Sequence, residues 1–412
     1  MIRNKLYAII CILITVSLLA GFQLACDTDE EEGTTGETIK IGWIDHLSGG
    51  GAGVAYQEVM GAKLAVEEIN DAGGVLGKEI ELIVRDDLGD PSKSSRIAKD
   101  LIVSDNVDFL AGTFNSANAL AISQVAKERE VLFMCASAQS ASITEEDGHR
   151  YVARAWSNSH SQCGPPAYYA AEQPWTKYIS ICGDYSWGHA AYEDFSNFLE
   201  EKNPDVTFAD PLWPKYGETD FSPYITKIMS ENTDAVFVGL WGAGCVAFIK
   251  QAMAAGMLDD TTLIVALDQD IKESMGTEMP EGIVGFNGFN IGIDDEWAKD
   301  WIDTIYDSMG VYPGGGSWQG YVTIYWFKEA IEKAGTVETE AVIDALDNLT
   351  MDTFVGTVTM REFDHQADGA QWIGITTFVP EYPEFAVMKD NTYIPGSEFL
   401  PSVEEVKAMR GE

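Results

Sequence analysis

Residues 38–78 read TIKIGWIDHLSGGGAGVAYQEVMGAKLAVEEINDAGGVLGK, and this stretch decides the fold class. It begins with the short apolar run TIKIGWI, which is typical of a buried strand. The run EVMGAKLAVEEIN follows with apolar residues at helical spacing, and the glycines of DAGGVLGK end that helix. A strand, a glycine-rich turn and a helix in this order predict a unit of an α/β fold.

The same alternation continues along the chain. IELIVRDD, VDFLAGT and VLFMCAS are further strands with helical runs between them. After residue 175 the strands TKYISICGD, DAVFVGLWG and TTLIVALD alternate with the helices AAYEDFSNFLEE and AGCVAFIKQAMAAG. Strands that alternate with helices predict parallel sheets covered on both faces. Two such series in a body of about 370 residues predict two doubly wound lobes.

The first residues predict export. Arg3 and Lys5 precede an uncharged apolar stretch, and an acidic segment follows Cys26. This pattern predicts a signal peptide over residues 1–25, a lipidated Cys26 and a flexible tether over residues 26–37. A membrane-spanning anchor is the alternative, because about 20 apolar residues can cross a bilayer. Either arrangement places the body outside the cytoplasmic membrane, at the periplasm or cell surface.

Charge and cysteine content narrow the class of protein. The formal net charge of −40 excludes nucleic acid and anionic membrane surfaces as partners. We interpret the acidic surface as one that keeps the protein soluble. Beyond the predicted signal and Cys26, four cysteines remain, and their spacings match no zinc site. We expect small buried thiols for most of them, while an oxidising compartment would also permit a disulfide. They are Cys135, Cys163, Cys182 and Cys245.

Turns after the strands are the places where an open parallel sheet binds ligands. The first is glycine-rich (Gly49, Gly50, Gly51 and Gly53), but no phosphate-binding motif accompanies it, so a tight turn close to a ligand is favoured over a nucleotide site. Ser116 stands at the predicted beginning of a helix, where it suits a carboxylate or is a plain helix cap. The polar run SAQSASIT follows the next strand. Two adjacent polar turns predict an anion site.

The second series of strands ends in aromatic residues. Trp187 and Trp241 follow two of its strands, and Asp268 ends a third. Aromatic side chains beyond strand ends suit the wall of an apolar pocket. Asp268 is either a partner for a ligand cation or a simple turn residue.

Signals for catalysis are absent from the sequence. The histidines form no HExxH motif, and no serine has the GxSxG context. Asp364, His365 and Asp368 in FDHQADGA predict an exposed polar turn between strands, with a metal site as the alternative. We therefore expect no enzyme, no metal and no cofactor.

The chain resembles the leucine/isoleucine/valine-type (branched-chain amino acid) solute-binding proteins of ABC transporters, over about residues 38–390. The resemblance rests on IKIGWIDHLSG, GAKLAVEEINDAGGVLGKEIELIVRDDLGDPSKS, FLAGTFNSANALA, GDYSWGHAAYEDF and TDFSPYITKIMSENTDAVFVGLWGAGCVAFIKQAMAAGM. It implies a type I periplasmic-binding fold, with two doubly wound parallel-sheet lobes joined by three crossovers near residues 157, 287 and 357. The implied division is lobe 1 over 38–157 and 288–356, lobe 2 over 158–287 and 357–400, and a C-terminal tail over 401–412.

Site residues follow from the same resemblance. Ser116 matches the serine that binds the ligand carboxylate, and Asp268 matches the acid that pairs the ligand ammonium. Ser137, Ala138 and Gln139 occupy the second carboxylate and ammonium turn, where Ser or Thr is usual at the position of Gln139. Trp187 and Trp241 occupy positions of pocket aromatics. Val54 replaces an aromatic, and the disulfide of the first lobe is absent.

The predicted function is an extracytoplasmic solute-binding component of an ABC importer. Its ligand is an amino acid or a related small carboxylate, its partner is a membrane permease, and a lipid anchor holds it at the membrane. A ligand sensor that reports to a membrane receptor and an extracellular enzyme are the alternatives, because a fold does not fix a function.

Overall fold

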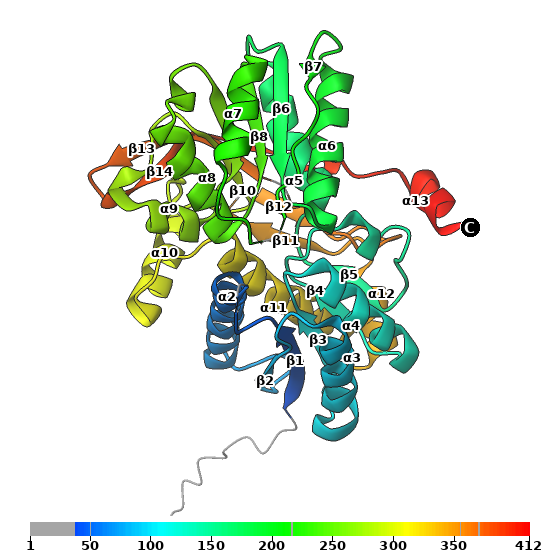
Figure 1. The fold of residues 1–412 in the computed structure, drawn as a ribbon. Helices are drawn as coiled ribbons and strands as arrows, with labels where there is room; N and C mark the ends of the chain where they lie inside the picture. Colours follow the sequence, from blue (N-terminus) through cyan, green and yellow to red (C-terminus); the bar gives the residue numbers. More distant parts are fainter. Residues whose placement is uncertain (1–37, 50, 216, 355, 370) are drawn as a thin grey trace, which may run out of the picture. The chain divides into compact units, whose positions relative to one another are not determined.

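The computed structural model describes residues 38–49, 51–215, 217–354, 356–369 and 371–412 (Figure 1). The predicted signal peptide, the tether and Cys26 lie outside these residues. No helix within the described ranges is long and apolar enough to cross a bilayer.

The first sheet has five parallel strands in the order β2-β1-β3-β4-β5. Every residue of β3, β4 and β5 is buried, as expected for a parallel sheet with helices on both faces. The strands are β1 (Ile39–Asp45), β2 (Ile80–Asp86), β3 (Phe109–Gly112), β4 (Phe133–Cys135) and β5 (Val152–Arg154), and the helices between them are α2 (Ala52–Asp71), α3 (Pro91–Asp100) and α4 (Ser116–Arg129).

The second sheet has seven strands in the order β14-β13-β10-β9-β8-β6-β7. The five from β10 to β7 are parallel, and β13 and β14 add an antiparallel ribbon that the sequence pattern did not predict. The strands are β6 (Lys177–Cys182), β7 (Thr207–Phe208), β8 (Ala235–Gly239), β9 (Thr262–Ala266), β10 (Val284–Asn287), β13 (Gln371–Val379) and β14 (Tyr382–Ile394); the helices are α5 (Ser159–Ala171), α6 (Ser186–Lys202), α7 (Ser222–Glu231), α8 (Gly242–Ala254) and α9 (Gln269–Met275).

Both sheets share one topology. Read from β7, the order β7-β6-β8-β9-β10 repeats the order β2-β1-β3-β4-β5. In such sheets the strand order reverses beside the first strand, and ligands bind beyond the carboxyl ends of the strands at that point. These ends are β1 and β3 in the first sheet, and β6 and β8 in the second. The two predicted doubly wound lobes are thereby confirmed.

The chain passes between the sheets three times. It leaves the first sheet after β5 and the second after β10, and it returns to the second at β13. Between the second and third passages lie α10 (Glu296–Met309), α11 (Gly315–Ala334), α12 (Thr339–Leu346) and the hairpin of β11 (Thr350–Thr353) with β12 (Gly356–Thr359); α13 (Val403–Arg410) follows β14.

Helices α2 and α11 lie side by side, and their backbones approach closely (Figure 1). A Cβ atom on Gly61 would overlap the carbonyl oxygen of Ser317, and one on Gly320 would overlap that of Glu58. Glycine is therefore required at both positions for the two backbones to touch. This contact holds the beginning of α11 against the middle of α2.

The segment before β13 differs from the prediction. Asp364 and His365 are buried, with 4% and 5% of their surfaces exposed, and do not form an exposed turn. Asp364 pairs with Arg361 at 2.9 Å, and His365 contacts Asp347 at 3.0 Å. The His365 carbonyl accepts a hydrogen bond from the Arg154 N–H, so the segment is covered where the chain crosses between the sheets. Periodicity could not reveal this, because the covering residues are far away in the sequence.

The four cysteines of the body are free and buried in the hydrophobic core. Burial raises the pKa of the Cys135 thiol to about 11, so it is neutral at physiological pH. The four thiols act as small apolar residues, as predicted.

Candidate functional site

Ser116 is the first residue of α4, but it does not cap the helix. Asn115 is the cap, and its side chain accepts hydrogen bonds from the N–H groups of Ala117 and Asn118 at 3.0 and 3.2 Å. The plain helix-cap interpretation of Ser116 is therefore wrong. Its Oγ accepts a hydrogen bond from the Ser140 N–H at 3.2 Å, and its hydroxyl hydrogen stays available for a ligand.

The turn of Ser137, Ala138 and Gln139 lies next to Ser116, because the Ser140 N–H bond joins the two segments. The Ala138 N–H is used internally, since it donates to the Thr113 carbonyl at 2.9 Å. The N–H groups of Ser116, Ser137 and Gln139 have no hydrogen-bond partner among the residues that the structure describes. Three main-chain donors and one hydroxyl thus lie on two adjacent turns.

The Gln139 side chain folds back over this turn. Its Nε2 donates to the Ser137 carbonyl at 2.9 Å, and its Oε1 accepts from the Ser157 hydroxyl at 3.2 Å. The Ser137 hydroxyl donates in another direction, to Glu58 on α2. The sequence predicted the location of this turn but not these contacts.

Glu58 is a residue of the site that sequence reasoning missed. Its side chain is fully buried, and its carboxyl contacts that of Asp45 at the end of β1. Burial and the neighbouring charge of Asp45 raise the pKa of Glu58 well above its ordinary value. Burial also raises the pKa of Asp45, so the two carboxyls share a proton.

The shared proton belongs to Glu58. Asp45 accepts hydrogen bonds from the Trp43 indole at 3.2 Å, from the His46 N–H at 2.9 Å and from the Thr113 hydroxyl at 2.9 Å, and these donors stabilise its anion. Glu58 has one donor, Ser137, and its Oε2 has no partner among the described residues unless it donates a proton to Asp45. A neutral Glu58 below the Ser137 turn adds no negative charge there.

Two aromatic side chains also lie at this end of the first sheet. His46 follows β1 and stacks on Phe114, which follows β3, with ring centroids 5.9 Å apart and planes 7° apart. Both rings are half-buried. The strand-end rule that located Ser116 would have found them too.

Trp187 and Trp241 meet beyond the second sheet, as their strand-end positions predicted. Their rings form an edge contact at 5.7 Å, and Tyr185 stacks on Trp187 at 6.1 Å. Trp187 is 8% exposed, and its indole N–H donates to Gln162 at 2.7 Å, so it is largely a core residue. Trp241 is half-buried and offers more surface to a ligand.

Asp268 follows β9 and joins two helices. Its Oδ1 accepts from the N–H of Gln269, which begins α9, at 2.7 Å and from the N–H of Gly315, which begins α11, at 3.0 Å. Gly315 is followed by Gly316, which packs against Glu58, so Asp268 lies near the Ser137 side of the site. Within the described residues, no hydrogen bond or ring contact joins the two tryptophans to Ser116, Ser137 or Asp268.

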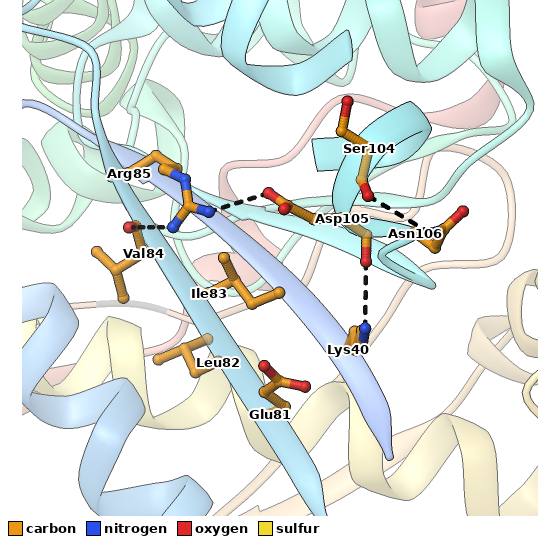
Figure 2. A pocket seen from close by; sticks show the side chains of 9 residues that line it. All are labelled: Lys40, Glu81, Leu82, Ile83, Val84, Arg85, Ser104, Asp105 and Asn106. Atoms are coloured by element: carbon orange, nitrogen blue, oxygen red, sulfur yellow. Dashed lines mark hydrogen bonds and ion pairs between the residues drawn. The ribbon is translucent and has the colours of Figure 1, made fainter. Parts of the chain in front are cut away.

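Two surface pockets lie away from these residues. One of about 520 Å³ lies along the edge strand β2, where Arg85 pairs with Asp105 at 3.0 Å and Lys40 donates to the Asp105 carbonyl (Figure 2). The other, of about 940 Å³, lies between the Thr359–Asp368 segment and α13. Neither includes a residue predicted to bind the ligand, although His365 and Asp368 of the alternative metal site line the second. The site is therefore assigned from the open hydrogen-bond donors and aromatic rings at the strand ends, and not from these two pockets.

The sequence profile of the periplasmic binding proteins matches residues 38–374. This chain belongs to that family. Among relatives of this periplasmic binding protein, the Leu/Ile/Val-binding protein BraC3 of Rhizobium johnstonii is 29% identical over 331 residues, which cover 79% of this chain and 88% of the relative. A leucine-, isoleucine-, valine-, threonine- and alanine-binding protein of Pseudomonas aeruginosa is 26% identical over 342 residues, or 81% and 87% of the two chains. The resemblance inferred from the sequence is confirmed.

Solved structures agree on the fold. A solute-binding protein of Rhodopseudomonas palustris in complex with 3,4-dihydroxybenzoic acid superimposes with a TM-score of 0.78 at 23% identity, over 87% of this chain and 96% of the other. The closed form of a leucine-, isoleucine-, valine-, threonine- and alanine-binding protein from Brucella ovis gives 0.79 at 23% identity, over 89% and 98%. The type I fold is confirmed, and membership of the periplasmic family implies a location outside the cytoplasm.

Proposed function

We propose that this periplasmic binding protein is the solute-binding component of an ABC importer and that it binds a small carboxylate between two lobes. The lobes comprise residues 38–157 with 288–356, and residues 158–287 with 357–400. A lipid on Cys26 anchors the chain, and the ligand-bound form docks on a membrane permease. The named relatives bind branched-chain and other small amino acids, and a structural neighbour binds a dihydroxybenzoate, so both kinds of carboxylate are candidates.

One observation carries the proposal. Ser116 and the Ser137–Gln139 turn are joined by a hydrogen bond, and together they offer three open N–H groups and one hydroxyl. A carboxylate accepts several such donors at once, and hydrogen bonds to charged groups are worth about 1.5–3 kcal/mol each. The open N–H of Ser116 at the beginning of α4 adds the favourable end of a helix dipole.

The aromatic side chains supply the rest of the proposed site. His46 and Phe114 lie at the carboxylate end, and Trp241 with Tyr185 and Trp187 lies beyond the second sheet. Closure of the two lobes would place the body of the ligand between these groups. Contacts to both lobes would shift an open–closed equilibrium toward the closed form.

Calorimetry on Ser116→Ala tests this function. We expect the loss of one charged hydrogen bond to weaken carboxylate binding by about 10- to 100-fold. The melting temperature should fall only slightly, because the Ser140 N–H loses its bond to Ser116. Ser92→Ala, a serine in the first turn of α3 whose hydroxyl makes no hydrogen bond to a described residue, is the control. Wild-type affinity in Ser116→Ala for a carboxylate that binds would contradict the assignment.

A further inference from the structure

A main-chain acceptor of the proposed site, the Ser137 carbonyl, already holds a hydrogen bond from the protein. A ligand carboxylate needs donors, whereas a ligand ammonium needs acceptors such as carbonyl and carboxylate oxygens. The Ser137 carbonyl lies on the turn where the resemblance places both groups, and the Gln139 Nε2 donates to it at 2.9 Å. Because a carbonyl can only accept, the nitrogen of the amide must face it.

The Gln139 amide is held in this orientation from its other end. The Ser157 hydroxyl donates to the Gln139 Oε1 at 3.2 Å, and the Gln371 Nε2 donates to the Ser157 oxygen at 3.3 Å. In this series of hydrogen bonds each group has a fixed role as donor or acceptor. The amide can leave the Ser137 carbonyl only if its bond to Ser157 also breaks.

Asp268, the second acceptor, is occupied at one of its two oxygens, and its Oδ2 makes no hydrogen bond to a described residue. Its Oδ1 accepts from the N–H groups of Gln269 and Gly315, and only 5% of the residue is exposed. A buried cation, Lys272, lies within the field of the Asp268 charge. The two N–H groups hold one oxygen of this carboxylate in place, and Asp270 and Glu273 add negative charge around Lys272, so Asp268 by itself does not select against a ligand cation.

The donors nearby remain open, in contrast to the Ser137 carbonyl. The N–H groups of Ser116, Ser137 and Gln139 lack partners among the described residues, and the Ser116 hydroxyl hydrogen is available. Glu58 below the turn is neutral, so a ligand carboxylate meets no second negative charge from it. The two turns therefore offer donors for a ligand carboxylate, while the Gln139 amide fills the acceptor beside them.

We propose that the ligand is a carboxylate without an α-ammonium group, and that the Gln139 amide takes the place of that group at the Ser137 carbonyl. The inference rests on the proposed function and names its substrate class. Gln139 determines specificity by filling the position that an ammonium would need. The half-buried rings of His46, Phe114 and Trp241 fit a ligand with an aromatic or branched apolar body.

Matched ligand pairs test the inference by calorimetry. 3-Phenylpropionate and phenylalanine differ only in the α-ammonium group, as do 4-methylpentanoate and leucine. We expect the wild type to bind whichever of the two simple acids it prefers at least tenfold more tightly than the matching amino acid. In Gln139→Thr the Ser137 carbonyl is open, and the ratio should shift toward the amino acid by tenfold or more. Gln173→Thr removes an amide that donates to a carbonyl at the end of α5, and it should leave the ratio unchanged.

The possible outcomes separate the two proposals. Tighter or equal binding of the amino acids by the wild type would overturn the substrate class while the carboxylate function stands. An unchanged ratio in a folded Gln139→Thr would overturn the role of Gln139. If that variant does not fold, Ser157→Ala keeps Gln139 but frees its amide, and it should shift the ratio in the same direction; no shift overturns the role. Failure of the wild type to bind either pair, benzoate or 4-hydroxybenzoate would overturn the proposed function itself.

Discussion

The Nδ1 atom of His160 lies 2.8 Å from the Oδ1 atom of Asp194, and the other ring nitrogen lies 3.3 Å from Glu145. His160 and Asp194 belong to α5 and α6, whereas Glu145 follows β4 of the first sheet. One imidazole thus joins the two halves of the chain beside the first passage between the sheets. Burial disfavours its charge, but the two carboxylates outweigh this and raise the pKa of His160 to about 10.

The raised pKa predicts a pH-dependent stability. A group whose pKa is higher in the folded state stabilises the fold fully below its unfolded pKa of 6.5, and this contribution is lost as the pH rises toward 10. We expect His160→Gln to lower the free energy of unfolding by about 3 kcal/mol at pH 6, because two buried carboxylates lose their cation. Urea unfolding from pH 6 to pH 10 should show the difference from wild type shrinking as the pH rises.

His189→Gln is the control for this prediction. His189 contacts Asp184 at 2.9 Å, but both side chains are largely exposed, and such pairs contribute less than about 1 kcal/mol. A similar loss of stability in both variants, or a difference from wild type that does not depend on pH, would contradict the charged state of His160.

Glycine contacts between α2 and α11 give the second prediction. Gly61→Ala would push a methyl group into the Ser317 carbonyl, so we expect a loss of about 2–4 kcal/mol despite the better helix propensity of alanine. Gly53 lies on the same helix with no atom near its missing side chain, and Gly53→Ala should be neutral or stabilising by up to about 1 kcal/mol. Thermal unfolding measures both. Equal melting temperatures for the two variants would show that the helices can separate.

The sequence allowed the edges of the site to be predicted, but not its interior. Ser116 and the Ser137 turn were found because strand ends and parallel-sheet topology fix their place. Glu58 looked like any acid on the polar side of a helix, and its burial depends on the glycines of α11, more than 250 residues away in the sequence. Trp187 was predicted as a pocket wall, but Gln162 on a neighbouring helix accepts its N–H and draws it into the core.

The two tryptophans therefore make different predictions. Trp241→Ala should weaken ligand binding by tenfold or more with a small loss of stability, because its ring is half-buried and its N–H has no partner among the described residues. Trp187→Ala should cost about 3–5 kcal/mol of stability, because it empties a packed position in the core. Calorimetry and thermal unfolding on both variants separate the roles. Equal stability losses would contradict this division.

Processing at Cys26 is tested in cells. The proposed lipid on Cys26 predicts that Cys26→Ala is released from membranes or remains unprocessed. Labelling with a radioactive fatty acid and fractionation of the membranes measure this outcome, and Cys135→Ala, a buried thiol of the body, is the control. Unchanged labelling and membrane retention in Cys26→Ala would remove the anchor from the proposal.

The proton on Glu58 gives the last prediction. The charged and titratable groups around it are Asp45 on β1, Asp268 after β9 and the Cys135 thiol, and none of them is a cation. As the pH rises through the raised pKa of Glu58, its carboxyl ionises below the turn that holds the ligand carboxylate. Two negative charges then repel each other in a buried site, and affinity should fall by about tenfold or more.

Glu58→Gln separates this charge effect from a loss of structure. A glutamine amide reproduces the neutral acid, since its nitrogen donates to Asp45 while its oxygen accepts from Ser137. The variant should bind a carboxylate as tightly at high pH as the wild type does at low pH. Glu68→Gln, on the same helix and bonded to the hydroxyl groups of Tyr321 and Tyr325, should keep the wild-type pH dependence. If the affinity of Glu58→Gln still fell with rising pH as in the wild type, the titrating group would be another residue. The neutral carboxyl below the Ser137 turn would then not explain how a protein with a large negative charge binds an anion.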